Sequence, residues 1–198
     1  MSNNGQRVPH HSVSDVFPNR WSPRSFTGEP IADDELSRLF EAARWAPSSY
    51  NSQPWRFLYA KRDSSDFDRF LGLLYERNQS WAKNASALVI LVSKTTVRPP
   101  GSDVEVPSRT HAFDAGAAWA YLALEASLAG WSAHGIGGFD IERAASELKV
   151  PDDHEVQIAI AIGRRGERDA LPEAFRPLEQ PNARLPVSET TRAGSFLG

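Results

Sequence analysis

Arg20, Ser22 and Arg24 are well placed to do chemistry together, because they occupy alternate positions around Pro23. Proline fixes its own φ and disfavours helix at the preceding residue, so the segment should be extended. Alternate residues of an extended chain share a face, which would direct two guanidinium groups and a hydroxyl at one target. Guanidinium groups bind phosphates and carboxylates through charge-assisted hydrogen bonds. The pattern predicts an anion site, with two surface ion pairs as the alternative.

A second polar cluster lies between Pro47 and Pro54, where a predicted helix ends and a predicted strand begins. Its hydroxyl, amide and phenol groups come from Ser48, Ser49, Tyr50, Asn51, Ser52 and Gln53. Such a segment can simply be a turn, because these residue types favour turns. Its hydrogen-bonding capacity exceeds what a turn requires, so it is also a candidate for ligand binding.

Several chemistries are excluded or disfavoured. The chain has no cysteine, which excludes disulfides, thiol nucleophiles and cysteine metal sites. Its five histidines show no ligand spacing, so we expect no metal. Residues 135–138 lack the spacing of the dinucleotide fingerprint, and neither a P-loop nor a nucleophile elbow occurs. The remaining groups fit a protein that holds a cofactor whose own atoms react, with Arg20 and Arg184 as candidate ligands of a cofactor phosphate.

Length and charge narrow the class of protein. At 198 residues the chain is long enough for one well-packed domain, and we expect a flexible arm at 1–12 and a domain at 13–198. A net charge of -3 gives no electrostatic reason to bind nucleic acid or an anionic membrane. The first dozen residues lack the apolar core of a secretory signal, and no run approaches the ~20 apolar residues of a membrane span. We therefore expect a soluble, cytoplasmic protein.

Apolar periodicity predicts the elements that position these residues. Helical spacing favours helices at 13–17, 33–45, 64–74, 111–131 and 141–148. Strand-like runs occur at 56–60, 87–92 and 155–162. The intervening polar or glycine-rich segments predict a connection at 78–81, an exposed loop or lid at 94–109 and a turn at 132–140.

The helix predicted at 111–131 is rich in alanine and has few polar faces. A helix of this kind should be buried nearly all round. Burial on every side in so small a chain suggests that a second subunit covers part of it. Residues 164–198 contain several prolines and little periodicity, so we expect them to form an extension that wraps the partner subunit.

Five segments together resemble the FMN-dependent nitroreductase family. They are R-W-S-P-R-S-F (20–26), A-P-S-S-Y-N-S-Q-P-W-R-F (46–57), N-Q-S-W (78–81), G-I-G-G-F-D (135–140) and N-A-R-L-P (182–186). They occur in the family's order and span essentially the whole predicted domain. The resemblance implies an α+β fold, namely a three-layer α/β/α sandwich with a central, mostly antiparallel sheet. It also implies a homodimer with two FMN sites at its interface.

The resemblance implies roles for the arginines. Arg20 and Ser22 would hold the phosphate and ribityl end of FMN, and Arg184 would bind the phosphate. Arg24 would approach the pyrimidine edge of the flavin ring, where a fixed cation stabilises the negative charge of the reduced form. Asn182 departs from the family pattern, because some members have a second phosphate-binding cation at this position. The alternative for Arg184 is an exposed residue of the tail.

Three residues near the predicted turn are also implicated by the resemblance. Gly138 would direct its N–H to flavin N5, and a glycine lets the backbone come that close. Gly137 would belong to the same cofactor-binding turn, although some members have glutamate there. Asn78 would contact the flavin from the same subunit. For the glycines the alternative is a tight turn alone, and for Asn78 a helix cap or a turn.

The same resemblance implies that the loop after Pro47 acts on the other subunit. Pro47, Ser48, Ser49 and Asn51 would cover the flavin of the partner. Tyr50 would help to form the substrate pocket.

The implied activity is ping-pong transfer of hydride through flavin N5, from NADH or NADPH to a nitroaromatic, quinone or similar small-molecule acceptor. Because the flavin carries the chemistry, no side chain is predicted to be catalytic, and Gly138 and Arg24 would assist. Two alternatives stay open: a dimer that binds or stores flavin with little turnover, and a dehalogenase-like or flavin-fragmenting relative with the same fold.

Overall fold

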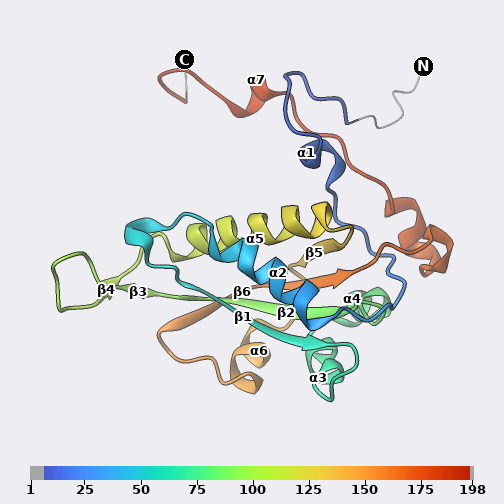
Figure 1. Cartoon of the computed structure of the whole chain (residues 1–198), viewed down its shortest axis with the longest axis horizontal. Coiled ribbons are helices and arrows are strands. Elements are labelled where there is room, and N and C mark those ends of the chain that lie inside the picture. The colour runs from blue at the N-terminus through green and yellow to red at the C-terminus, as the bar shows by residue number, and fades with distance from the viewer. Residues whose placement is uncertain (1–6, 197–198) are drawn as a thin grey trace.

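A computed structural model gives the fold of residues 7–196, to which the structural statements below apply. Its centre is a four-stranded antiparallel sheet, in the order β1 (Trp55–Lys61), β2 (Ala87–Lys94), β6 (His154–Gly163), β5 (Ser132–Ile136). One face is covered by α2 (Asp33–Arg44) and α5 (His111–Leu128), and the other by α3 (Phe67–Gly72), α4 (Glu76–Ala82) and α6 (Ile141–Glu147) (Figure 1). The predicted α+β fold, a three-layer α/β/α sandwich, is confirmed.

Strand β2 supplies both hydrophobic cores, because successive side chains of a strand point to opposite faces of the sheet. Leu88 and Ile90 pack with the core that contains α3, α4 and α6. Val89 and Leu91 pack with the core that contains α2 and α5. The prediction of a strand covered on both faces is confirmed.

The glycine-rich segment 132–140 is more ordered than predicted. It begins with β5, which pairs with β6 at the edge of the sheet, so the prediction of a simple turn is wrong. A Cβ at Gly135 would lie 3.4 Å from the Trp119 ring. Glycine here therefore lets α5 pack closely against the strand.

Two other predicted connections also contain regular structure. Residues 78–81 belong to α4, because the buried Trp81 draws this segment into the core and only its other side chains are polar. In the predicted loop at 94–109, β3 (Thr96–Val97) and β4 (Val106–Pro107) form a small hairpin.

Helix α5 is covered on one side only within the single chain. Its buried residues include Asp114, Ala118 and Leu122. An apolar strip on its other side is exposed, including Phe113, which is 79% exposed, and Leu128 at 66%. Burial of this helix on nearly all sides therefore needs a second subunit, as the sequence suggested, and it stays a prediction because these side chains are exposed within residues 7–196.

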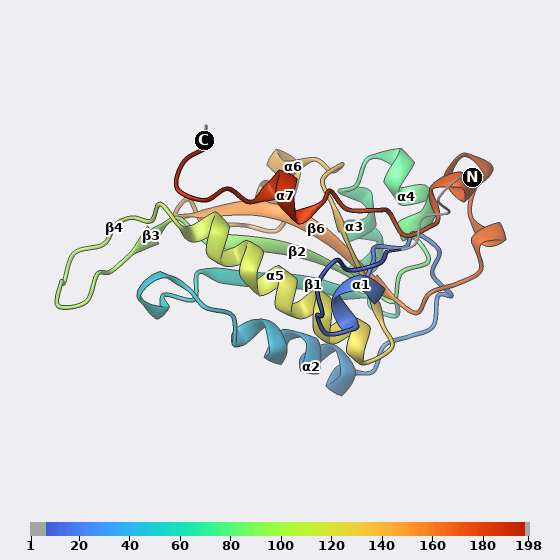
Figure 2. The same cartoon turned by 90° about the horizontal axis from the view of Figure 1, so that it is seen from above.

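The two ends of the chain form arms beside each other. Residues 7–19, which end in α1 (Val16–Asn19), and the segment around α7 (Val187–Thr190) both extend away from the sheet (Figures 1 and 2). The short helices η2 (Arg168–Ala170) and η3 (Glu173–Leu178) connect β6 to the C-terminal arm. Residues 1–6 of the predicted arm at 1–12 lie outside the described residues. No helix within residues 7–196 has the length and apolar character that a membrane span needs.

Candidate functional site

The extended segment 20–26 is held by the chain that follows β6. The Gly166 N–H donates to the Ser25 carbonyl at 2.8 Å. The Glu179 carboxylate accepts hydrogen bonds from the N–H groups of Arg24 at 3.0 Å and Ser25 at 2.9 Å. Such charge-assisted bonds are short and directional, so they fix the backbone from which the Arg24 side chain projects.

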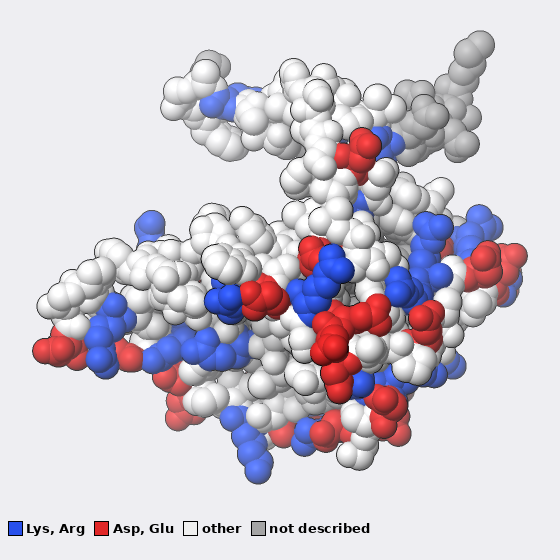
Figure 3. All heavy atoms as spheres, in the orientation of Figure 1, with Lys and Arg blue, Asp and Glu red and all other residues white. Residues whose placement is uncertain are grey.

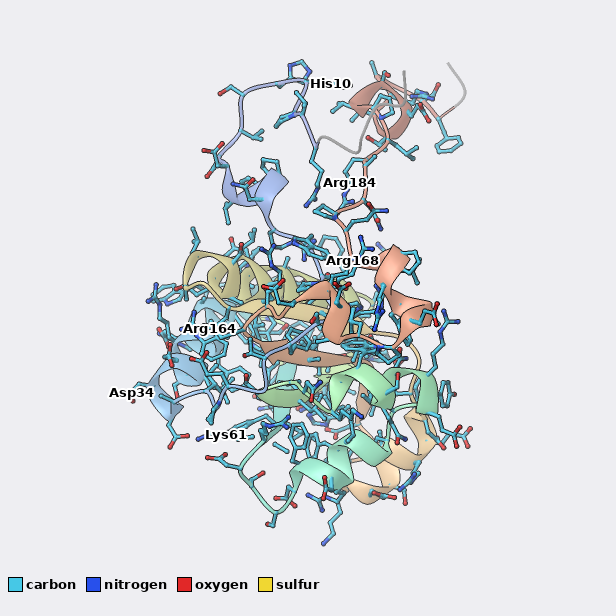
Figure 4. The ribbon with its side chains drawn as sticks, turned by 90° about the vertical axis from the view of Figure 1, so that its right-hand side faces the viewer. His10, Asp34, Lys61, Arg164, Arg168 and Arg184 are labelled. Carbon is cyan, nitrogen blue, oxygen red and sulfur yellow. The ribbon has the colours of Figure 1, made fainter. Side chains whose placement is uncertain are left out.

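The three alternating residues of this segment meet at one place, which the intervening Trp21 also lines. Arg20, Ser22 and Arg24 line one cavity of about 210 Å³. Within it, the Arg20 guanidinium donates to the Ser22 hydroxyl at 3.2 Å. Arg184 lines the same cavity and lies where the C-terminal arm leaves the body of the protein (Figure 4). The wall is completed by Trp21, His134, Leu178, Gln180 and Asn182.

The arginines of this cavity are not neutralised by acidic side chains. None of the ion pairs within residues 7–196 includes Arg20, Arg24 or Arg184. Burial, and then the positive charge of Arg184, lowers the pKa of Arg20. A half-buried cation beside a second cation is unfavourable without an opposite charge. The arrangement is typical of a site for an anionic ligand.

His134 is a neutral, buried part of the cavity wall. Its Nδ1 lies 2.9 Å from the Pro23 carbonyl, an acceptor, so Nδ1 carries the hydrogen. The pKa of His134 is lowered to about 4, mainly by burial; the carbonyl contacts of Pro23 and Ser22 oppose this shift, and the neighbouring cations Arg24 and Arg20 add to it. The imidazole therefore adds no positive charge to the site at neutral pH.

Lowering the pH should destabilise the protein through His134. Its pKa is about 4 in the folded protein and ordinarily 6.5, so the unfolded chain binds the extra proton between these values. The free energy of unfolding should therefore fall as the pH drops from 6.5 towards 4, by up to about 3 kcal/mol. Urea unfolding at pH 7 and pH 5 measures this, with His134→Asn as the comparison because asparagine keeps a donor for Pro23. An equal pH dependence in both proteins would contradict the assignment.

Gly138 is tied to the cavity through a chain of side-chain contacts. Its carbonyl accepts from Asn78 Nδ2 at 2.9 Å, and the Asn78 Oδ1 accepts from the Trp81 indole at 3.2 Å. The Trp81 ring then packs on His134, with centroids 4.8 Å apart. A Cβ at Gly138 would lie 2.4 Å from Asn78 Nδ2, so a larger residue here would displace the Asn78 amide from its present position. Gly137 is under no such packing constraint, because a Cβ there would meet nothing within 4 Å.

The backbone N–H of Gly138 is available for a ligand. The Gly138 carbonyl accepts from Tyr75 N–H and from Asn78, but its own N–H donates to no group within residues 7–196. A cofactor atom that accepts a hydrogen bond could therefore bind here without displacing an internal contact.

The loop after Pro47 is anchored to α5 and is strained. The Ser49 N–H and the Thr110 hydroxyl both donate to the buried Asp114 carboxylate, at 3.2 and 3.1 Å. Three of its non-glycine residues have left-handed backbones: Tyr50 (φ 54°), Asn51 (φ 52°) and Gln53 (φ 48°). Such backbones cost free energy and occur often at functional sites.

Within one chain, the structure does not bring this loop to the arginines. The loop lies at the N-terminal end of α5, beside β3 and β4, whereas the arms leave the body away from this end (Figures 1 and 2). Among the described residues, Pro47, Ser48, Ser49 and Asn51 line none of the cavities that Arg20 lines. Tyr50 is 65% exposed.

A long groove connects α5 to the arginine cavity. It has a volume of about 640 Å³, and Arg20 and Ser22 line it as well as the smaller cavity. Its walls come mainly from the exposed strip of α5, including Ala112, Gly116 and Ala120, and from β5 and β6. Figure 3 shows open space between the arms and the body above part of this face. A ligand with an anionic end and a flat apolar part would match the two cavities.

The sequence did not point to three residues of the site. Glu179 and Arg7 come from irregular segments, and Arg7 donates to the Arg20 carbonyl at 2.6 Å. His134 lies on β5, a strand that was predicted as a turn because the segment is rich in glycine. Of the three, only His134 left a usable signal, because it stands two positions before the buried Ile136 and so shares a face of the strand with it.

Comparisons with known proteins give matches over most of the chain. A family model described as the nitroreductase family matches residues 18–80 and 65–164. A crystal structure described as an oxidoreductase containing FMN is 42% identical, with a TM-score of 0.92, and the match covers 99% of this chain and 98% of that one.

Curated relatives extend the comparison. An uncharacterised 15.4 kDa protein of Mycolicibacterium smegmatis is 34% identical over 150 residues, which cover 71% of this chain and 97% of that protein. A Bacillus subtilis protein named "Putative NAD(P)H nitroreductase YodC" is 26% identical over 207 residues, which cover 89% of this chain and 96% of that protein.

Proposed function

This chain belongs to the nitroreductase family, and we propose that it is an FMN-dependent oxidoreductase that transfers hydride from NADH or NADPH to a nitroaromatic, quinone or similar acceptor. The observation that carries the proposal is the cavity where Arg20, Ser22, Arg24 and Arg184 converge without an acid to neutralise them. The similarity to a structure described as containing FMN supports it.

The residues of the cavity fit FMN in charge and hydrogen bonding. Arg20, Ser22 and Arg184 would bind the phosphate and the ribityl end, because guanidinium groups form paired hydrogen bonds with phosphate oxygens. The guanidinium of Arg24, whose backbone N–H is held by Glu179, would stabilise negative charge on the ring. When bound, FMN supplies an N5 atom that accepts and returns hydride, so no catalytic side chain is required.

The glycine segment would complete the ring site. We assign the free N–H of Gly138 to the flavin N5, with Gly137 beside it in the same turn. Asn78 holds Gly138 in place through the Gly138 carbonyl, and a larger residue at Gly138 would displace the Asn78 amide. Its contribution would thus include positioning the backbone donor.

A second copy of the chain would cover the groove. The exposed strip of α5 is apolar, and exposed apolar faces of this kind mark association sites. In a homodimer, Pro47, Ser48, Ser49 and Asn51 would reach the cofactor of the partner, and Tyr50 would line its substrate pocket. This arrangement would explain why the loop, which is anchored to α5 and strained, lines none of the cavities that Arg20 lines in its own chain. The C-terminal extension would wrap the partner.

Anaerobic titration of the purified protein tests the proposal. We expect a yellow dimer whose visible flavin absorbance disappears on addition of NADH or NADPH. Turnover with a quinone or a nitroaromatic compound should give parallel lines in double-reciprocal plots, as ping-pong kinetics require.

Two outcomes would exclude this activity. A colourless protein that takes up no flavin when incubated with FMN would exclude FMN dependence altogether. Bound FMN that neither nicotinamide reduces would exclude the proposed turnover and favour a flavin-storage dimer, or a relative that performs dehalogenation or flavin fragmentation.

A further inference from the structure

Arg7 belongs to the N-terminal arm, and a main-chain carbonyl holds its side chain beside the predicted phosphate site. One of its terminal nitrogens, Nη1, donates to the Arg20 carbonyl at 2.6 Å. Its Nε is buried and has no hydrogen-bond partner within the described residues. A buried guanidinium N–H without an acceptor is unfavourable, so the acceptor is expected to come from outside the described residues.

Arg7, Arg20 and Arg184 converge on one cavity of about 470 Å³ between the two arms. Burial lowers the pKa of Arg7, and the charges of Arg184 and Arg20 lower it further. None of the three forms an ion pair within residues 7–196. Residues 1–6 contain no aspartate or glutamate to neutralise them.

We propose that Arg7 is a third guanidinium ligand of the anion that Arg20 and Arg184 bind, and that this anion is the terminal phosphate of FMN. The inference rests on the proposed function for the identity of the cofactor. A phosphate monoester carries close to two negative charges and offers three acceptor oxygens, which matches a cluster of cations with an unused donor.

The cavity composition explains why a third arginine is needed. Arg20 and Arg184 line both this cavity and the smaller one, in which Asn182 contributes a neutral side chain. Arg184 is exposed and its Nη1 already donates to the carbonyls of Asn182 and Ala183. Arg7 supplies a half-buried donor from the other arm, so the phosphate would connect the two arms.

Binding of FMN and riboflavin by the full-length protein tests this, because riboflavin lacks the phosphate. After removal of bound flavin, Kd is measured for both from the quenching of flavin fluorescence. Arg7→Gln should raise the Kd for FMN about 10-fold or more and leave that for riboflavin unchanged, because a charge-assisted hydrogen bond is lost. Inorganic phosphate should compete with FMN in the wild type and compete less well in the variant. Arg192→Gln, which removes an exposed cation of the C-terminal arm, is the matched control and should bind FMN like the wild type.

A rescue variant separates a role in binding from a role in folding. Adding Asn182→Lys to Arg7→Gln introduces a cation from another wall and should recover most of the lost FMN affinity.

Three outcomes are decisive. If Arg7→Gln binds FMN as tightly as the wild type, or weakens FMN and riboflavin equally without rescue, Arg7 is not a phosphate ligand. If free phosphate competes in both proteins equally, the anion is bound without Arg7. If the wild type binds neither flavin, the proposed function itself fails, which the other two outcomes do not imply.

Discussion

Arg20→Gln should lose FMN, whereas Arg24→Gln should keep FMN but be reduced slowly. Arg20 is half-buried, contacts Ser22 and lines both cavities with Arg184, so its removal takes away a central phosphate ligand. The loss of a hydrogen bond to a charged group should raise Kd for FMN about 10- to 100-fold. Arg24 projects from a backbone fixed by Glu179 and would act on charge that develops in the ring during reduction.

Flavin titration gives the Kd of each variant, and stopped-flow mixing with NADH or NADPH gives the rate of flavin reduction at saturating FMN. Arg168→Gln, which changes an exposed arginine of η2, serves as the charge-matched control. Equal effects of Arg20→Gln and Arg24→Gln on both quantities would contradict the separate roles assigned to these residues.

Ala120→Glu should produce a monomer that cannot retain flavin. Ala120 is exposed on the apolar strip of α5 and lines the groove that a second copy would cover. In a two-fold symmetric dimer the substitution would bury two unpaired carboxylates. Burial of each costs several kcal/mol, so the dimer should weaken by more than about 100-fold.

Light scattering during size-exclusion chromatography measures the assembly, and the absorbance of the eluted protein measures bound flavin. Ser146→Glu adds the same charge at an exposed position of α6, on the opposite face of the sheet, and should remain a yellow dimer. A monomeric Ala120→Glu protein that keeps its FMN would show that each chain holds its cofactor without the partner's loop.

The elements with strong periodicity were predictable from the sequence, and those with weak periodicity were not. Helix α2 and strands β1, β2 and β6 repeat apolar residues at regular spacing, because each buries one face or two. Strand β5 has too many small residues for such a pattern, and its pairing with β6 comes from the fold as a whole. Helix α4 contains a single large core residue in a polar sequence, Trp81, and so looked like a connection.

The same distinction applies to the site. The shared face of Arg20, Ser22 and Arg24 follows from local geometry alone, because alternation in an extended chain needs no knowledge of the rest of the fold. The contact between Arg7 and Arg20, and that between Glu179 and Arg24, join irregular segments that are distant in the sequence. Nothing in a single sequence marks such pairs.

The left-handed residues of the loop after Pro47 also affect how this protein could be engineered. Each non-glycine residue in that conformation costs on the order of 1 kcal/mol, and glycine avoids most of this cost. Selection for heat resistance alone would therefore tolerate glycine at Tyr50 or Gln53. Glycine at Tyr50 would, however, remove the phenol proposed for the substrate pocket. A library screened only for melting temperature would thus tend to erase specificity, so this loop should be held constant or screened for activity first.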